Sequence, residues 1–139
     1  MADELRMTIA NRLEELRRVE GEVSAFLEAR RVPPAWIYAA SLALEEMLTN
    51  IIKYGYDDDR EHEIVLHAAL DGRELALTLE DDGHAFDPTA LPPPDATRRL
   101  EDRPVGGLGI HLTRKMTDGM SWRREGGRNI LQIVIRRTA

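Results

Sequence analysis

The sequence predicts an α+β protein in which helices cover one face of a mostly antiparallel sheet, giving a two-layer sandwich. Two observations carry this prediction. Apolar residues recur every three or four positions in two segments of the first half, as they do in amphipathic helices. Farther along, segments with alternating apolar residues come in pairs, and a short turn containing glycine joins the two members of each pair. Helices, hairpin, helix and hairpin therefore follow one another along the chain.

The first half of the chain is expected to contain one strand and two helices. Residues 4–10 are predicted to form a strand, and residues 11–30 an amphipathic helix. Two prolines end that helix and open a second one over residues 35–54, after which a glycine stops it. The apolar face of the first helix is formed by Leu13, Leu16, Val19, Val23 and Leu27.

The second half is expected to contain two hairpins with a helix between them. Residues 62–70 and 73–80 are predicted as strands joined by an Asp-Gly turn. Two glycines join a second pair of strands, at residues 119–125 and 128–136. Between the hairpins, a proline-rich loop at about 87–104 leads into the glycine-rich start of a third helix. A loop of that length in a small domain is usually a functional lid or disordered.

The composition is that of a single globular domain spanning residues 1–139, with 42% apolar residues. The chain has no cysteine, which excludes disulfide frameworks and thiolate metal sites. Without a signal peptide, and without an apolar run near the ~20 residues of a membrane span, it is expected to be cytoplasmic and not membrane-bound. Acidic residues number 25 and basic residues 19; the net charge of −6 disfavours nucleic acid as a direct partner.

The last third of the chain is locally basic, and its arginines have two open interpretations. They form an ordinary solvated face, or they form a surface that meets nucleotide phosphates or an acidic protein. Three of them, Arg98, Arg99 and Arg103, lie on the expected loop.

The second predicted helix carries two polar residues one turn apart. With Leu44 at the centre of the buried face, Glu46 and Asn50 fall on the opposite side. The ordinary interpretation is a pair of solvent-facing residues. A functional interpretation also exists, because an amide oxygen is a hard ligand for Mg²⁺ and a carboxylate can accept a proton from an attacking hydroxyl.

A carboxylate stands at the end of one predicted strand. Asp81 continues the alternation of Leu75, Leu77 and Leu79, so it is expected at the edge of the core, where an unpaired charge is costly. The ordinary interpretation is a turn, since Asp-Asp-Gly begins many loops. In the functional interpretation, Asp81 accepts a hydrogen bond from the exocyclic amine of a base, and Gly83 lets the base approach closely.

Three glycines, Gly106, Gly107 and Gly109, lie at the start of the third predicted helix. The free N–H groups and the dipole of a helix start favour a phosphate, although glycines precede many helices for other reasons. The run has neither the Gly-Lys-Ser/Thr end of a Walker motif nor the preceding parallel strand of a dinucleotide fingerprint. The order of the three segments is more informative than any one of them.

With these segments in this order, the chain resembles the GHKL ATPase superfamily, which has the Bergerat nucleotide-binding fold. Within it, the chain is most similar to the small anti-sigma factor serine/threonine-protein kinases, over nearly its whole length. ALEEMLTNIIKYGY resembles the N-box, LEDDGHAFDP the adenine-binding box and GGLGIHLTRKMTD the glycine box. Ala85 stands where the larger superfamily often has glycine, a departure that the small anti-sigma members tolerate.

The resemblance implies a role for each candidate residue. Glu46 would be the general base and Asn50 a ligand of Mg²⁺. Asp81 would face the adenine amine of ATP, with Gly83 beside it. The glycines at the phosphates would be Gly106, Gly107 and Gly109.

The resemblance also implies a function. The protein would use Mg-ATP to phosphorylate a STAS-domain anti-anti-sigma factor, would sequester a sigma factor, and would form a homodimer. Two alternatives stay open: a nucleotide-dependent interaction module without kinase activity, and a plain α+β domain without a ligand. Glu46 favours catalysis, because a module that only binds has no need of it.

Overall fold

The computed structural model describes residues 2–90 and 107–136. These residues form five strands, three α-helices and one short 3₁₀ helix. Most of the predicted loop, together with Gly106, lies outside the described residues. The elements are β1 Asp3–Ala10, α1 Glu15–Ala29, α2 Pro34–Tyr54, β2 Glu63–Leu70, β3 Glu74–Asp81, η1 Pro88–Ala90, α3 Gly107–Met116, β4 Gly119–Glu125 and β5 Arg128–Arg136.

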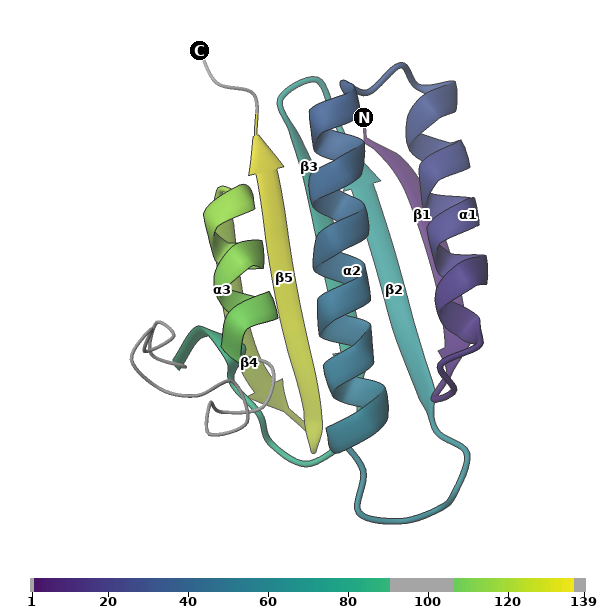
Figure 1. The fold of residues 1–139 in the computed structure, drawn as a ribbon, viewed down its shortest axis with the longest axis vertical. Coiled ribbons are helices and arrows are strands. Elements are labelled where there is room, and N and C mark those ends of the chain that lie inside the picture. The colour runs from purple at the N-terminus through teal and green to yellow at the C-terminus, as the bar shows by residue number, and fades with distance from the viewer. Residues whose placement is uncertain (1, 91–106, 137–139) are drawn as a thin grey trace.

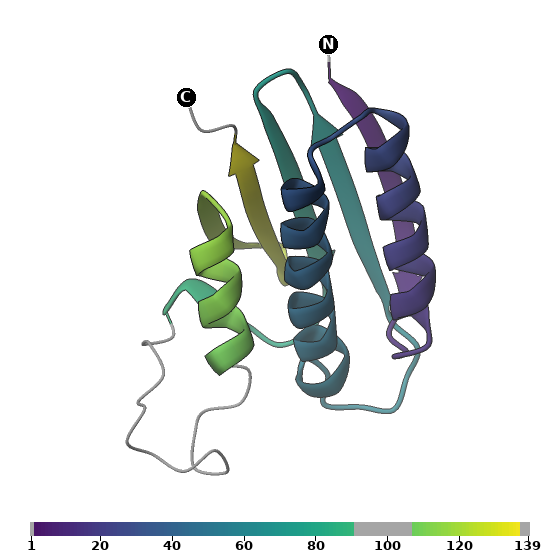
Figure 2. The same ribbon diagram turned by 45° about the horizontal axis from the view of Figure 1, so that its top comes forward.

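The five strands form one sheet in the order β1-β2-β3-β5-β4, and every neighbouring pair is antiparallel. Figure 1 shows the three helices on one face of this sheet, with α2 in the middle, α1 over β1, and α3 beside β5. The view in Figure 2 shows the same two layers. The predicted fold class, a two-layer α+β sandwich with a mostly antiparallel sheet, is therefore confirmed.

The core lies between the sheet and the helices. Leu75, Leu77 and Leu79 on β3 are almost fully buried, as their alternation predicts. Burying each such side chain contributes roughly 1.5–3 kcal/mol to folding. Among the described residues, no helix is both long enough and apolar enough to cross a membrane.

The first helix begins four residues later than the apolar period suggests, and Leu13 is 43% exposed rather than part of the buried face. The cause lies in Asn11. Its backbone N–H donates to the carbonyl of His62 (3.2 Å), and its Oδ1 accepts from the His62 backbone N–H (2.9 Å). These bonds hold the end of β1 beside the start of β2, so the chain cannot turn helical until Glu15.

The turn between β4 and β5 matches its sequence signal. Gly126 and Gly127 have φ of +55° and +76°, and Glu125 pairs directly with Arg128. Positive φ at both central residues is the geometry that a two-residue hairpin turn requires. This hairpin places β5, not β4, next to β3, and that position brings Asn129 opposite Asp81.

Candidate functional site

A cavity of about 250 Å³ lies between the second half of α2 and the adjoining ends of β3 and β5. Most of its lining is apolar, and a few polar groups converge on it, which is the usual composition of a small-molecule site. The residues that line it are Met47, Asn50, Ile51, Tyr54, Gly55, Asp81, His84, Phe86, Pro88, Trp122, Asn129 and Leu131.

Among the described residues, Asp81 is the only carboxylate in the cavity lining, and it is 4% exposed. Its Oδ1 accepts two hydrogen bonds, from the Gly83 backbone N–H (2.9 Å) and from Asn129 Nδ2 (3.0 Å). Its Oδ2 has no hydrogen-bond donor within the part of the chain that the structure describes. Oδ2 is not fully buried and Asp81 lines the cavity, so this oxygen is free to accept a hydrogen bond from a ligand that carries an N–H group.

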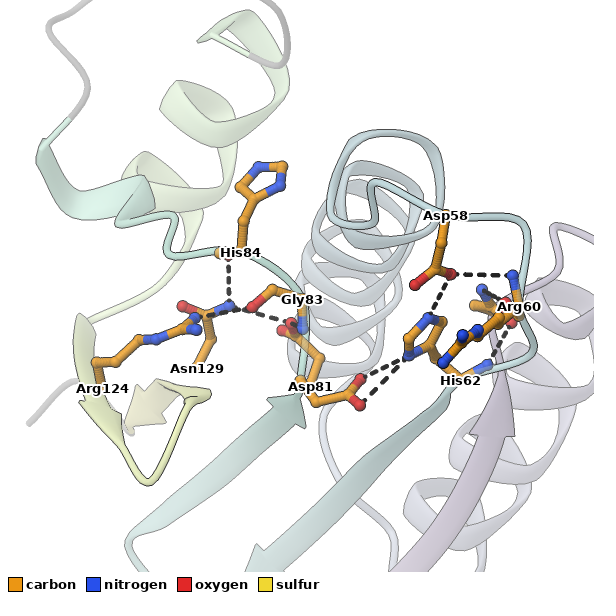
Figure 3. Close-up of polar contacts among 10 residues, drawn as sticks. Asp58, Arg60, His62, Asp81, Gly83, His84, Arg124 and Asn129 are labelled. Carbon is orange, nitrogen blue, oxygen red and sulfur yellow. Dashed lines mark hydrogen bonds and ion pairs between the residues drawn. The ribbon is translucent and has the colours of Figure 1, made fainter.

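Asn129 holds Asp81 in this orientation, as Figure 3 shows. The Asn129 side chain is 6% exposed and uses its whole hydrogen-bonding capacity. Nδ2 donates to Asp81 Oδ1 and to the carbonyl of His84 (2.9 Å), while Oδ1 accepts from Trp122 Nε1 (3.0 Å) and the Phe86 N–H (3.3 Å). One amide therefore fixes the carboxylate, the following loop and an aromatic wall of the cavity.

The sequence interpretation missed Asn129, although a signal for it exists. Asn129 occupies the inward phase of its strand, followed by Leu131, Ile133 and Ile135, all buried. The same alternation argument that singled out Asp81 therefore applies to Asn129.

Position 83 has no room for a side chain, for a reason that only the tertiary structure reveals. A Cβ atom there would collide with the carbonyl oxygen of Gly55 at the end of α2. The next residue, His84, donates its backbone N–H to the same carbonyl (2.9 Å). The absence of a side chain thus lets the loop after β3 lie against the helix end, and contact of Gly83 with a ligand stays a prediction.

Glu46 and Asn50 lie on the side of α2 opposite Leu44, as predicted, but both are partly buried. The sequence alone cannot show that α3 packs against that side of α2. Asn50 lines the cavity, and its Nδ2 donates to the backbone carbonyl of Glu46 (2.9 Å). Because a carbonyl can only accept, this hydrogen bond fixes the orientation of the Asn50 side chain, with Nδ2 toward the carbonyl. Asn50 Oδ1 is then available as an oxygen ligand.

The structure brings Glu46 and Gly109 together, although 63 positions separate them in the sequence. A Cβ atom on Gly109 would overlap the Glu46 carboxylate, at Oε2 and at the carboxyl carbon. Glu46 is not in the cavity lining, and its carboxylate has no hydrogen bond or ion pair among the described residues. Gly107 begins α3, so the first N–H groups of a ten-residue helix lie near this carboxylate.

The protein oxygen atoms at the site suit a metal ion that is coordinated jointly by the protein and by a bound small molecule. Within residues 2–90 and 107–136, no group of three or more His, Cys, Asp or Glu side chains could hold a metal ion. Mg²⁺ commonly takes only one or two protein oxygens and completes its shell with water and substrate phosphates. Asn50 Oδ1, at the cavity and one turn from Glu46, fits that arrangement.

A second polar cluster lies on the other side of the β3 end, as Figure 3 shows for Asp58 and His62. His62 Nε2 lies 2.8 Å from Asp58 Oδ1, and its Nδ1 lies 3.1 Å from Asp82 Oδ1. The Tyr56 ring stacks on the imidazole at 4.2 Å. Burial and the nearby Asp81 carboxylate raise the pKa of the Tyr56 hydroxyl, so it stays neutral. The cluster ties the segment after α2 to the residue beside Asp81.

Hydrogen bonding to Asp58, and then to Asp82, raises the pKa of His62 above its ordinary 6.5. The protonated imidazole therefore stabilises the folded state fully below pH 6.5, and this contribution disappears as pH rises through the folded-state pKa. The melting temperature is expected to fall over that window. In His62→Gln this fall should be absent; an unchanged pH profile in that variant would contradict the assignment.

Comparison with known proteins identifies the family of this chain. The family model described as the histidine kinase-like ATPase domain matches residues 9–135, which include α2, the β3 end and α3. The chain belongs to the histidine kinase-like ATPase domain family. The resemblance predicted from the sequence is confirmed, and the family's description implies that this domain binds ATP.

Two curated relatives of this ATPase domain are named as protein kinases. The serine/threonine-protein kinase BtrW of Bordetella bronchiseptica is 31% identical over 97 residues, which are 70% of this chain and 68% of that protein. The serine-protein kinase RsbW of Halalkalibacterium halodurans is 29% identical over 90 residues, which are 62% of this chain and 54% of RsbW. The match thus spans only about half of RsbW. Both names agree with the enzyme class predicted from the sequence.

A solved structure has the same fold. The crystal structure of the RsbU and RsbW domains of Rv1364c from Mycobacterium tuberculosis matches this ATPase domain with a TM-score of 0.69. It covers 96% of this chain and 32% of that chain, at 18% sequence identity. At that identity the match supports the fold, which is the one described above.

Proposed function

We propose that this ATPase domain is a protein serine/threonine kinase. In this proposal it uses Mg-ATP to phosphorylate a STAS-domain anti-anti-sigma factor, sequesters a sigma factor, and acts as a cytoplasmic homodimer. The names of the relatives BtrW and RsbW support the kinase assignment. The single observation that carries the proposal is the Asp81 carboxylate, buried at the cavity with one oxygen left for a donor.

The cavity residues explain the choice of an adenine nucleotide. Asp81 Oδ2 is suited to accept from an exocyclic amine, since both hydrogen bonds on Oδ1 come from the protein. Trp122, Phe86 and Ile51 supply apolar walls for a flat ring. A guanine would present a carbonyl where adenine presents its amine, and two acceptors facing each other repel.

The second half of the site is suited to phosphoryl transfer. Asn50 Oδ1 would hold Mg²⁺, which when bound neutralises phosphate charge and orients the phosphates. Glu46 would accept the proton of the serine or threonine hydroxyl at a carboxylate oxygen. The N–H groups at the start of α3, from Gly107 and Gly109, would donate to phosphate oxygens, and Gly106 is proposed to lie beside them.

Gly109 is expected to position Glu46. In Gly109→Ala, the methyl group would occupy the place of the Glu46 carboxylate. The flexible glutamate can move aside, so the free energy of unfolding should change by less than about 1 kcal/mol. Phosphoryl transfer should nevertheless fall about 100-fold, because small displacements of a catalytic group have large effects on rate. Urea unfolding and a phosphorylation time course measure the two quantities.

Gly21→Ala is the matched control for that variant. Gly21 lies within α1, and a Cβ atom there would meet nothing within 4 Å. This change should raise the free energy of unfolding by about 0.5–1 kcal/mol and leave phosphorylation unchanged. Full activity in Gly109→Ala would rule out the positioning role.

Incubation of the protein with labelled ATP, Mg²⁺ and a STAS-domain protein encoded beside its gene tests the proposed function. Label on a serine or threonine of the STAS protein is the expected result. No transfer, combined with a clear rise of the melting temperature in Mg-ADP, would indicate a nucleotide-dependent interaction module instead. No shift at millimolar nucleotide would exclude the ATP site as well, because a ligand present at 100 times its dissociation constant stabilises by about 2.7 kcal/mol.

A further inference from the structure

A groove runs along the outer surface between α1 and α2, which lie side by side in Figures 1 and 2. It consists of two adjoining hollows of about 520 and 640 Å³. Glu20, Ser41 and Glu45 line both hollows, so the two are continuous. None of the lining residues belongs to the cavity that contains Asp81.

The floor of the groove is apolar. Val19, Val23, Leu44 and Leu48 form its bottom and are at most 3% exposed. The apolar surface that a partner can reach comes from partly exposed side chains along it, Leu16, Ile37 and Leu42. Two large apolar side chains next to this floor are exposed to solvent: Leu13 is 43% exposed and Tyr38 63%. Exposed apolar surface that continues into a hollow is typical of a protein interaction site.

The rim of the groove is predominantly acidic. Four exposed glutamates line it, together with a single arginine, Arg17. None of these five side chains has a hydrogen bond or ion pair among the described residues. The glutamates are Glu14, Glu20, Glu28 and Glu45.

The remaining surface of α1 is different. Glu15 and Glu22 are both paired with Arg18, at 2.7 and 3.1 Å. The helix therefore pairs its carboxylates with Arg18 on one side, whereas those that face the groove form no ion pair among the described residues. Unpaired charges of one sign around an apolar floor favour a partner of the opposite sign.

We propose that the α1–α2 groove binds a basic amphipathic helix of a partner protein. Apolar side chains of that helix, at i, i+3 or i+4 and i+7, would fill the floor between α1 and α2. Lysines or arginines on its two flanks would meet the four glutamates. The lining residues of α1 run from Leu16 to Glu28, which corresponds to about 20 Å of helix and so to a bound helix of similar length.

The charge of the groove disfavours other occupants. A second copy of the same surface would bring like charges together, which costs free energy across an interface. Nucleic acid is repelled for the same reason. An extended strand finds no free sheet edge between two helices, so it would lose the backbone hydrogen bonds that give such a strand its affinity.

The test uses a fluorescein-labelled 15-residue peptide with leucines at helical spacing and lysines on the flanks. The control peptide has the same leucines and glutamates in place of the lysines. Fluorescence anisotropy should show binding of the lysine peptide alone. Glu45→Lys in the protein should weaken that binding about tenfold or more, because it replaces attraction by repulsion within the groove.

Glu63→Lys is the matched control, since Glu63 is exposed on β2 and lies outside the groove. It changes the net charge equally and should weaken binding less than threefold at physiological salt, where distant charges are screened. Ser41→Trp fills the groove without changing its charge and should abolish binding; a circular dichroism spectrum and a urea unfolding midpoint close to those of the unmodified protein show that this variant is folded.

Four results would overturn the proposal. They are no binding of the lysine peptide, equal binding of the glutamate peptide, equal weakening by Glu63→Lys and Glu45→Lys, and self-association of the protein that Glu45→Lys removes. The last result would make a second copy the occupant. Loss of kinase activity is not among them, so the groove and the proposed function succeed or fail separately.

Discussion

Phosphoryl transfer by Glu46→Gln is expected to be about 10²–10⁴-fold slower than by the unmodified protein, with little change in ATP affinity. Glutamine has nearly the same shape but cannot accept a proton, and positioned proton acceptors contribute about that factor. ATP affinity should be preserved because Glu46 does not line the cavity. Single-turnover transfer from labelled ATP measures the rate, and calorimetry with Mg-ADP measures the affinity.

Glu63→Gln is the control for that experiment, because it makes the same chemical change at an exposed position on β2. Its transfer rate should equal that of the unmodified protein. A normal rate in Glu46→Gln would remove Glu46 as the base. A loss of ATP affinity that parallels the loss of rate would instead assign Glu46 to nucleotide binding.

Asp81→Asn is expected to weaken ATP binding by about 10- to 150-fold. The asparagine Oδ1 can still accept from the Gly83 N–H and from Asn129, so the fold around the site should persist. Its Nδ2, however, would occupy the position of Oδ2 and face the adenine amine. Both groups are donors, so no hydrogen bond could form between them. The loss of a hydrogen bond to a charged group is worth about 1.5–3 kcal/mol, which gives that range.

Asp82→Asn is the neighbouring control. The Asp82 side chain is 42% exposed, contacts His62 and does not belong to the cavity lining. Its effect on ATP affinity should stay below about threefold. Equal losses of affinity in the two variants would show that the strand end, rather than the Asp81 carboxylate, determines binding.

The predicted order of elements is confirmed because short-range patterns determine it. Alternating leucines on β3 and the two-glycine turn before β5 are local features, and the structure has both where they are expected. The start of α1 was predicted wrongly, because Asn11 is held by a segment 51 positions away. A periodic pattern cannot detect such a contact, and tertiary hydrogen bonds overrode the local propensity.

The candidate site shows the same division. The sequence singled out Asp81, Asn50 and Glu46 by phase and spacing, and the structure places the first two at one cavity. It gave no sign that α3 covers the polar side of α2, which makes Glu46 a neighbour of Gly109. Asn129 could have been found by its inward phase, but its four hydrogen bonds could not.

By itself, the sequence determined the fold class, the family resemblance and the candidate residues, because periodicity, turn chemistry and motif spacing are written along the chain. The tertiary structure decided which of those residues meet. The pairing of β5 with β3 sets Asn129 against Asp81 and leaves one carboxylate oxygen for a ligand. The packing of α1 beside α2 creates an acidic groove that neither helix has alone. Both features depend on contacts between separate elements, which form only when burial of the shared core brings those elements together.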